Sequence, residues 1–302
     1  MEYIVVLICA VLSNIFFQKI FLNKNIIDKV NHRSSHSVKA TRTGGIVLYM
    51  TLFIYTVFLY LDGFQPYDFS IFIPISILFV TGLYDDIYNV DFGLKFIFQI
   101  IAAKILIDLG FVIDVFSIFG YQYEFERIIS QLVSIFIYLS LFNAYNFIDG
   151  IDLNIHLETI KNFIILVLIF NNSSIKTLIL FSIIVMCVNA FFNFSKKKKV
   201  FMGDSGSLII PMLLIIFIFE GLRFSDDQNV IKYLFIIFVY PIIDLIRVVF
   251  IRVINKKSPF KADKSHLHHL LEKFINSHAK TSSIIVTTTC IIQLILYKLL
   301  IN

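Results

Sequence analysis

Two carboxylates stand side by side at Asp85 and Asp86, directly after a long apolar run. Adjacent carboxylates repel each other, and the C-terminal end of a helix disfavours negative charge, so this pair favours a bound cation. A hard metal ion such as Mg²⁺, held by one or two carboxylates and completed by phosphate oxygens, would relieve the repulsion. A solvated pair that caps a membrane helix is the alternative that the pair alone leaves open.

A second polar group follows another apolar run and combines amides with carboxylates. Asn143, Asn146 and Asp149 recur every three residues and therefore share one face of a helix, and Asp152 follows Gly150. Donors and acceptors at the end of a membrane helix are costly to bury. The group predicts a polar binding surface, with an ordinary polar helix end and glycine turn as the alternative.

A glycine-rich segment, Met202-Gly203-Asp204-Ser205-Gly206-Ser207, precedes a further apolar run. Its glycines let backbone N–H groups approach a ligand closely, and the N-terminus of the following helix suits a phosphate. The carboxylate of Asp204 could hold a metal ion that the phosphates share. A glycine turn in which Ser205 or Ser207 caps the helix is the alternative.

Three histidines, His266, His268 and His269, form a cluster close to the lysines Lys261 and Lys264. Zinc binding is one interpretation of such a cluster. No cysteine accompanies the histidines, however, and the lysines favour an anion. We therefore expect a contact with phosphate or nucleotide, with a solvated interfacial loop as the alternative.

The segment 31–45 is basic and rich in hydroxyl groups, and it runs directly into an apolar stretch. Control of membrane topology is the simplest role for such a loop. Its last residues, Arg42-Thr43-Gly44-Gly45, resemble another phosphate-facing turn at the start of a helix. Lys39 precedes this turn by three residues.

The elements that must position these residues are membrane helices. Of the 302 residues, 58% are hydrophobic and only 16% are charged, and the mean hydropathy is +0.84. Soluble domains carry about 25% charged residues. A net charge of +5 would suggest nucleic acid for a soluble protein, but a lysine bias toward the cytoplasm explains it here, so we expect no nucleic-acid partner.

Hydropathy predicts one all-α polytopic membrane domain over residues 1–302, with about ten transmembrane helices. The run 159–171 is short, so it should borrow residues from its flanks. The alternating stretch 111–126 indicates a short outer β-hairpin. The ten apolar runs lie near 3–22, 44–61, 69–84, 93–109, 128–144, 159–171, 174–194, 208–222, 230–254 and 281–300.

Lysine and arginine counts orient these spans. The loops 23–43, 195–207 and 255–280 together hold 15 of these residues, whereas the loops on the opposite side contribute only Arg127 and Arg223. The basic loops, together with 85–92 and 145–158, should therefore face the cytoplasm, and both termini should face outward. All the polar motifs fall on the cytoplasmic side.

These motifs, in this order and spacing, resemble the polyprenyl-phosphate N-acetylhexosamine-1-phosphate transferases. The resemblance covers nearly the whole chain, including the passage from His36 to Gly45. It rests on Asp85-Asp86-x-x-Asn89, Asn143-x-x-Asn146-x-x-Asp149-Gly150-x-Asp152, Met202-Gly203-Asp204-x-Gly206-Ser207 and His266-x-His268-His269.

The resemblance implies transfer of a sugar-1-phosphate from a UDP-N-acetyl sugar to undecaprenyl phosphate, with release of UMP. It implies a Mg²⁺ cofactor (with Mn²⁺ as an alternative) and a bacterial cytoplasmic membrane, with the active site facing the cytoplasm. The barrier is mostly electrostatic because two anionic phosphates must meet, so positioning and charge neutralisation should dominate. The sequence leaves open the sugar and whether the protein forms a homodimer.

By the resemblance, the catalytic residues are Asp85, Asp86 and Asp204, and the metal ligands are Asp204 and Asp86. Asp85 would act as a base, bind metal or position the lipid phosphate. Substrate binding would fall to Lys39, Arg42, Thr43, Asn146, Asp149, Asp152, Gly203, Ser207, His266, His268 and His269.

One departure from the family pattern is Leu153, where a glycine usually follows Asp152. Losing that glycine removes backbone freedom, so we expect an altered sugar preference or weakened activity. Asn89, with the histidine spacing, favours the branch that initiates O-antigen, capsule or teichoic-acid glycans over the MurNAc-pentapeptide branch of peptidoglycan synthesis.

Two other classes of protein compete with the transferase. An ion- or proton-coupled transporter would account for Glu220 and Asp244 within apolar runs. A transporter, however, predicts acids in the middle of several spans, whereas the acids of this chain stand mostly at the cytoplasmic ends of the spans. An inactive paralogue would account for Leu153. We expect Asp244 to pair with Arg247, three residues later on the same helix face.

Overall fold

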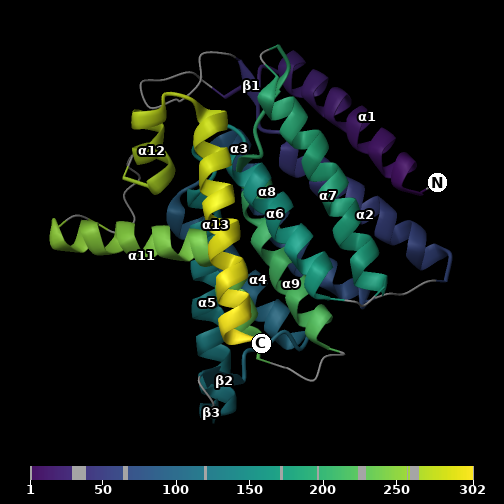
Figure 1. Ribbon diagram of the computed structural model, residues 1–302. Coiled ribbons are helices and arrows are strands. Elements are labelled where there is room, and N and C mark those ends of the chain that lie inside the picture. The colour runs from purple at the N-terminus through teal and green to yellow at the C-terminus, as the bar shows by residue number, and fades with distance from the viewer. Residues whose placement is uncertain are drawn as a thin grey trace.

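The computed structural model describes residues 2–28, 39–63, 67–118, 121–170, 173–195, 197–223, 229–256, 258 and 265–301. Helices dominate this part of the chain (Figure 1). The first half contains α1 (Glu2–Asn23), α2 (Gly44–Leu61), α3 (Phe72–Tyr88) with a preceding 3₁₀ turn (Phe69–Ile71), α4 (Phe92–Asp108), α5 (Arg127–Phe147) and α6 (Asn154–Ile169). The second half contains α7 (Ser173–Phe194), α8 (Gly203–Ser207), α9 (Ile209–Leu222), α10 (Val230–Ile237), α11 (Val239–Ile254), α12 (Leu267–Ile275) and α13 (His278–Leu300).

The chain is a polytopic membrane protein, as its composition predicts. Within the described residues, seven helices are long and apolar enough to cross a membrane, and the bent pair α10–α11 raises the number to eight. The other two predicted spans correspond to α4, with 17 residues, and α6, with 16 residues. Each is about 25 Å long, short of the roughly 30 Å hydrocarbon core. That these two helices also span the membrane remains a prediction.

Helix α9 forms the centre of the bundle. It is apolar on all sides, as expected of a helix with no solvent-facing stripe, and 94% of the span Gly203–Leu222 is buried. The surrounding helices include α3, α5, α6, α7 and α10. Because α8 leads directly into α9, the glycine-rich motif lies at one end of the most deeply buried candidate span among the described residues.

The predicted span over 230–254 is bent in the structure, a feature that the hydropathy pattern did not predict. The helix breaks at Phe238, and its two parts, α10 and α11, meet at 76°. Pro241, near the start of α11, has no N–H to continue the α10 hydrogen-bond ladder. In Figure 1, α11 accordingly projects sideways from the bundle and lies crosswise to α13.

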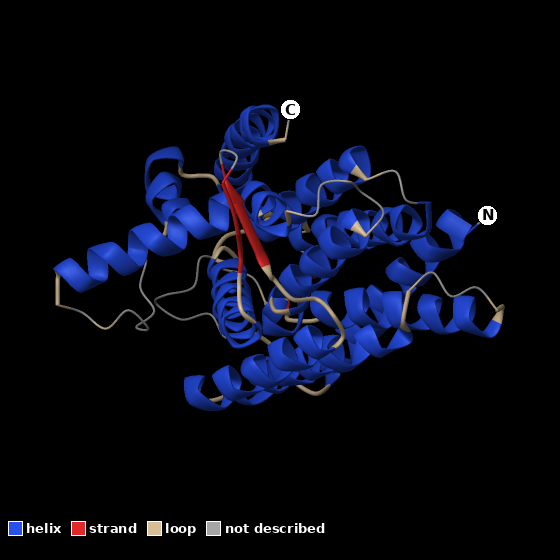
Figure 2. Ribbon diagram, turned by 90° about the horizontal axis from the view of Figure 1, so that it is seen from below, coloured by secondary structure: helices blue, strands red, loops and turns tan. Residues whose placement is uncertain are grey.

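Two short strand pairs complete the fold. The predicted hairpin is confirmed as β2 (Val115–Ile118) paired antiparallel with β3 (Tyr121–Glu124), shown in red in Figure 2. A second pair was not predicted: β1 (Ala40–Thr41) lies parallel to β4 (Lys199–Val200). In Figure 1, β1 and α12 lie at one end of the helices and the β2–β3 hairpin lies at the other.

Candidate active site

The parallel pair β1–β4 brings the first polar loop onto the glycine-rich motif. The N–H of Phe201 donates to the carbonyl of Thr41 at 2.8 Å. Returning bonds run from Gly44 to the carbonyl of Phe201 at 3.0 Å and from Gly45 to that of Met202 at 2.9 Å. The amides of the predicted phosphate-facing turn thus bind protein carbonyls, and they fix α2 against the glycine-rich segment.

Asp86 caps the helix that begins at Gly203. Its side chain is fully buried, and its two oxygens accept hydrogen bonds from the N–H groups of Asp204 at 2.9 Å and Ser205 at 3.0 Å. These amides would otherwise lack partners in the first turn of α8. The guanidinium of Arg42 lies 3.7 Å from the same carboxylate.

Gly203 makes this cap sterically feasible. Its φ is +70°, a left-handed conformation that favours glycine. A Cβ at this position would lie 2.5 Å from Oδ2 of Asp86. The motif therefore needs glycine both for its backbone conformation and for the close approach of the carboxylate.

A cluster around Asp204 forms the centre of the site. The ammonium of Lys95, on α4, contacts Oδ2 of Asp204 and lies 3.7 Å from Oδ2 of Asp85. Nδ2 of Asn146 donates to Oδ1 of Asp204 at 3.1 Å and to Oγ of Ser207 at 2.7 Å. The side chains of Asp85 and Asp204 keep 17% and 23% of their surface exposed, so the cluster can be reached from outside.

Sequence reasoning missed Lys95. A lone lysine near the start of an otherwise apolar run is itself a signal, because a charge within a membrane segment usually has a partner or a function. Lys95 lies ten residues after Asp85, and its position between two carboxylates is the one that a bound cation would favour.

Asp149 and Asp152 occupy different environments. Asp152 pairs with Lys199 at 2.6 Å and with Nδ1 of His278 at 3.1 Å, neither of which was predicted. Burial alone would raise the pKa of Asp152, but the hydrogen bonds from His278 and Lys199 outweigh it and lower the pKa. Burial, followed by the charge of Asp86, raises the pKa of Asp149 to about 7.

The turn after Asp152 retains a left-handed residue although glycine is absent. Leu153 has a φ of +66°, and its N–H donates to Oδ1 of Asn193 at 2.8 Å. The next residue, Asn154, donates to the carbonyl of Ile148 at 2.7 Å and to the hydroxyl of Tyr240 at 3.1 Å. These bonds hold Leu153 in a conformation that costs a leucine free energy.

Asp244 anchors the histidine segment. Its carboxylate accepts from Arg247 at 2.8 Å, which confirms the predicted pair, and from the N–H of Leu267 at 2.9 Å. Nδ1 of His266 lies 2.8 Å from its other oxygen. The first turn of α12 is therefore held by a carboxylate of α11.

His268 lies against the polar loop that follows α5. A Cβ at Gly150 would overlap its imidazole, so the two segments touch closely. Among the described residues, neither ring nitrogen of His268 has a hydrogen-bond partner. Burial, followed by the neighbouring His269, lowers the pKa of His268 to about 3. This imidazole is neutral at physiological pH and can offer a hydrogen bond but no charge.

Other predicted residues are less closely tied to the cluster. Thr43 is buried, and its hydroxyl lies 3.2 Å from that of Thr41. Lys39 is exposed directly before β1. Several basic residues of the predicted loops lie outside the described residues: Lys29, Arg33, His36, Lys261 and Lys264.

The residues present fit a magnesium ion that takes only part of its ligands from the protein. Within the described part of the chain, no group of three or more histidine, cysteine or acidic side chains is arranged as a metal site. Mg²⁺ usually takes only one or two protein carboxylates and completes its shell with water and phosphate. Asp204 and Asp85, which face one ammonium group, provide such a pair.

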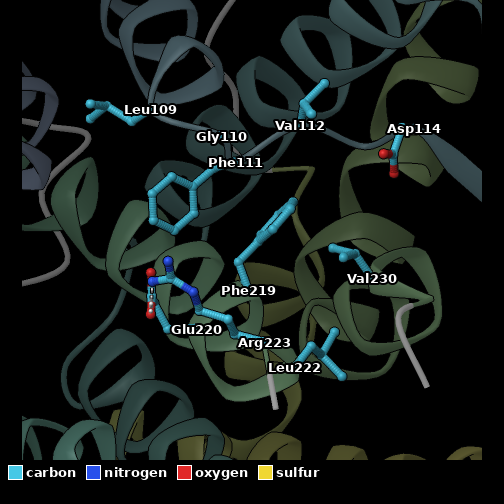
Figure 3. A pocket seen from close by; sticks show the side chains of 10 residues that line it. All are labelled: Leu109, Gly110, Phe111, Val112, Asp114, Phe219, Glu220, Leu222, Arg223 and Val230. Carbon is cyan, nitrogen blue, oxygen red and sulfur yellow. Dashed lines mark hydrogen bonds and ion pairs between the residues drawn. The ribbon is translucent and has the colours of Figure 1, made fainter. Parts of the chain in front are cut away.

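Two of the hollows formed by the described residues contain none of the charged residues of the cluster. One, of about 360 Å³, lies at the end of α9 near the β2–β3 hairpin and contains the Glu220–Arg223 ion pair (Figure 3). No predicted site residue lines it. The other is an apolar groove of about 600 Å³ between α3 and α4, lined by Ser76, Ile77, Val80, Thr81, Tyr84, Val90, Leu94 and Phe98.

Comparison with known proteins identifies relatives of this chain by sequence. A family model described as "Glycosyl transferase family 4" matches residues 68–222. A "Probable undecaprenyl-phosphate N-acetylglucosaminyl 1-phosphate transferase" of Bacillus subtilis is 27% identical over 288 residues, which cover 91% of this chain and 78% of the relative. An "Undecaprenyl-phosphate alpha-N-acetylglucosaminyl 1-phosphate transferase" of Pasteurella multocida is 29% identical over 287 residues, covering 90% and 78%. The protein of that name from Escherichia coli K12 is 24% identical over 268 residues, covering 85% and 71%.

Proposed function

Because the chain belongs to glycosyl transferase family 4, we propose that it transfers N-acetylglucosamine-1-phosphate from UDP-N-acetylglucosamine to undecaprenyl phosphate. The reaction releases UMP and begins a lipid-linked surface glycan. The printed names of the relatives support this choice of sugar and lipid. The observation that carries the proposal is the Asp204–Lys95–Asp85 cluster, which combines carboxylates and a cation at one end of a membrane bundle.

The demands of the proposed reaction follow from the negative charge on both phosphate-bearing substrates. An oxygen of the lipid phosphate attacks the β-phosphorus of the nucleotide sugar. A new P–O bond forms, and the bond from that phosphorus to the oxygen bridging to UMP breaks. A phosphate monoester has its second pKa near 6 and is largely dianionic at neutral pH, so it needs little help from a base. The protein must mainly neutralise and align two anions.

The residues divide this work between them. Asp204, with Asp85, would hold Mg²⁺, and the metal ion would neutralise charge on the phosphates. Asn146 orients the Asp204 carboxylate. We assign Asp86 a positioning role rather than metal coordination, because both of its oxygens already bind backbone amides of α8.

The polar end of the bundle faces the cytoplasm of a bacterial cell in this proposal. UDP-sugars are made and kept on that side of the membrane. The excess of lysine and arginine in the loops at this end supports that orientation, and all the relatives named above are bacterial proteins. The β2–β3 hairpin then lies on the outer face.

The groove between α3 and α4 is our candidate for the lipid chain. It is apolar, and Tyr84 and Leu94 in its lining are the immediate neighbours of Asp85 and Lys95. A prenyl chain in this groove would place its phosphate beside the cluster. We expect Leu94→Trp to raise the KM for undecaprenyl phosphate while the KM for the UDP-sugar stays unchanged. Leu12→Trp, at an exposed position on α1, is the matched control.

Purified protein supplied with Mg²⁺, undecaprenyl phosphate and UDP-N-acetylglucosamine tests the activity directly. We expect UMP release together with a lipid-linked sugar diphosphate, and loss of both in Asp204→Asn. Asp62→Asn, an exposed carboxylate after α2, should keep the native rate. UDP-N-acetylgalactosamine and UDP-MurNAc-pentapeptide, assayed in parallel, identify the sugar. If no UDP-sugar yields UMP, the transferase proposal is wrong.

A further inference from the structure

The break between α10 and α11 leaves a backbone carbonyl without its helical donor. In a continuous helix the carbonyl of Ile237 would accept from the N–H of residue 241. That residue is Pro241, which has no N–H. Regular bonds flank the break, from Phe238 to Leu234 and from Ile242 to Phe238, each at 2.9 Å. The deficit is therefore local to the bend.

Gln293 supplies the missing donor from another helix. This residue of α13 is 1% exposed. Its Nε2 donates to the carbonyl of Ile237 at 3.1 Å and to that of Ile236 at 2.9 Å. The same group donates to Oδ1 of Asn162, on α6, at 3.0 Å. Burying a glutamine in an apolar bundle costs free energy. Here all three hydrogen bonds of its Nε2 run to oxygen acceptors, so the position requires a donor.

The two contacts that follow the bend lead to the candidate active site. Tyr240, two residues after the break, accepts from Asn154 in the turn that follows Asp152. Asp244, one helical turn later, holds His266 and the N–H of Leu267. The direction of α11 thus determines where the histidine segment meets the polar loop.

We propose that Gln293 is a positioning residue of the site: its side-chain amide replaces the N–H that Pro241 lacks and so fixes the angle at which α11 presents Asp244 and the histidines. Gln293 touches none of the predicted substrate-binding residues. It acts through the bend. The inference rests on the proposed transferase function for its kinetic readout only.

A distance measurement tests the proposal without any activity. Spin labels at Val253→Cys and Leu299→Cys, both exposed, report the angle between α11 and α13 after the native cysteines are replaced by alanine. We expect one narrow distance distribution in the native background. Gln293→Met keeps the length of the side chain but removes the donor, so the distribution should broaden or shift. Ile291→Met, at an exposed position of the same helix, is the matched control.

Kinetics provide the second readout. A misplaced histidine segment should lower kcat/KM for the UDP-sugar by about tenfold to a hundredfold, while the KM for undecaprenyl phosphate changes little. Pro241→Ala restores an N–H at the bend, so Gln293→Met should cost less in that background than alone. Such coupling would not arise if Gln293 merely filled space.

The outcomes separate this proposal from the proposed function. An unchanged distance distribution in Gln293→Met, or a kinetic loss that is equal with and without Pro241→Ala, would overturn the positioning role. A native protein that transfers no sugar would contradict the transferase proposal instead, while the distance measurement would still decide the role of Gln293.

Discussion

Lys95 is the cation that lets two carboxylates, Asp85 and Asp204, face one point without a bound metal. Two carboxylates that face the same point repel each other strongly where water is partly excluded. A bound Mg²⁺ would compete with the ammonium for the same oxygens. If these carboxylates hold Mg²⁺ as proposed, the lysine should have two consequences: it stabilises the site before substrate binds, and it weakens the affinity of the site for free metal.

Replacing this lysine should uncouple metal binding from catalysis. In Lys95→Met we expect transfer to fall at least about a hundredfold, because the charged groups lose their arrangement. We also expect Mg²⁺ alone to raise the melting temperature more than it does in the native protein, because no ammonium competes for the carboxylates. Thermal unfolding across a Mg²⁺ titration measures this effect. Lys104→Met, on the same helix, is the control, since Lys104 pairs with Asp108 in an exposed contact. Equal Mg²⁺ effects in Lys95→Met and the native protein would contradict the assignment.

The raised pKa of Asp149 predicts how stability depends on pH. Burial, and then the charge of Asp86, raises this pKa from its ordinary value of 3.8 to about 7. The folded substrate-free protein keeps the proton up to about pH 7, whereas the unfolded chain loses it near pH 4. Native stability attributable to Asp149 is therefore complete at low pH and declines as the pH rises toward 7.

Asp149→Asn should avoid this decline. The melting temperatures of the variant and the native protein should be closest near pH 4, and the variant should gain on the native protein as the pH rises to 7. Above pH 7 the difference should stay constant. Melting curves in detergent between pH 4 and 8 measure it. A difference that does not change with pH would show that Asp149 does not titrate in this range.

The sequence was sufficient to select the acidic and amide side chains that the structure brings together, but not their partners. Asp85, Asp86, Asn146 and Asp204 stand out because carboxylates and amides at the ends of apolar runs are costly. In the sequence Lys199 is one of four consecutive lysines, and nothing there distinguishes it. In the structure it pairs with Asp152, a residue 47 positions away. Which member of a lysine run turns inward depends on the tertiary structure, and a single sequence does not contain that information.

The turn between α5 and α6 accommodates a leucine in a conformation that suits glycine. The left-handed conformation costs a leucine about 1–2 kcal/mol. Hydrogen bonds made by the side chains of Asn193, on α7, and of Asn154, the next residue, hold the turn in place. The turn therefore keeps its left-handed conformation at a cost in stability. An altered sugar preference remains a prediction.

Substitutions at Leu153 should follow the backbone rather than hydrophobicity. We expect Leu153→Gly to be more stable than Leu153→Val by about 1 kcal/mol or more, because a β-branched residue fits φ of +66° worst. Thermal unfolding of the two variants in detergent provides the comparison. If the valine variant melts at or above the glycine variant, the turn does not carry this strain.

Hydropathy predicted where helices occur but not how they bend or join. The run 230–254 is continuously apolar, so a window of that length does not detect the break, although Pro241 marks its position. The strands β1 and β4 have two residues each, too few for any alternating pattern to appear. Both features depend on contacts between distant segments. The short hairpin was predictable because its alternation and its turn are local.

The orientation of the whole molecule can be tested with two exposed positions at opposite ends. Tyr121, in the β2–β3 hairpin, is 84% exposed, and Lys198 is exposed beside β4. In a cysteine-free background, a membrane-impermeant maleimide added to intact spheroplasts should label Tyr121→Cys. Lys198→Cys should react only after the membrane is permeabilised. The reverse pattern would overturn the proposed orientation.

The cap that Asp86 forms on α8 also constrains how the protein is made. Asp204 follows Asp86 by 118 positions, an interval of about 6–24 s at ordinary rates of synthesis. During that time a carboxylate destined for full burial has no α8 amides to bind. Arg42, whose guanidinium lies 3.7 Å from Asp86 in the folded protein, precedes it in the chain and has already been synthesised. A cation for Asp86 is therefore present long before the helix that Asp86 will cap, and the site can form only late in membrane insertion.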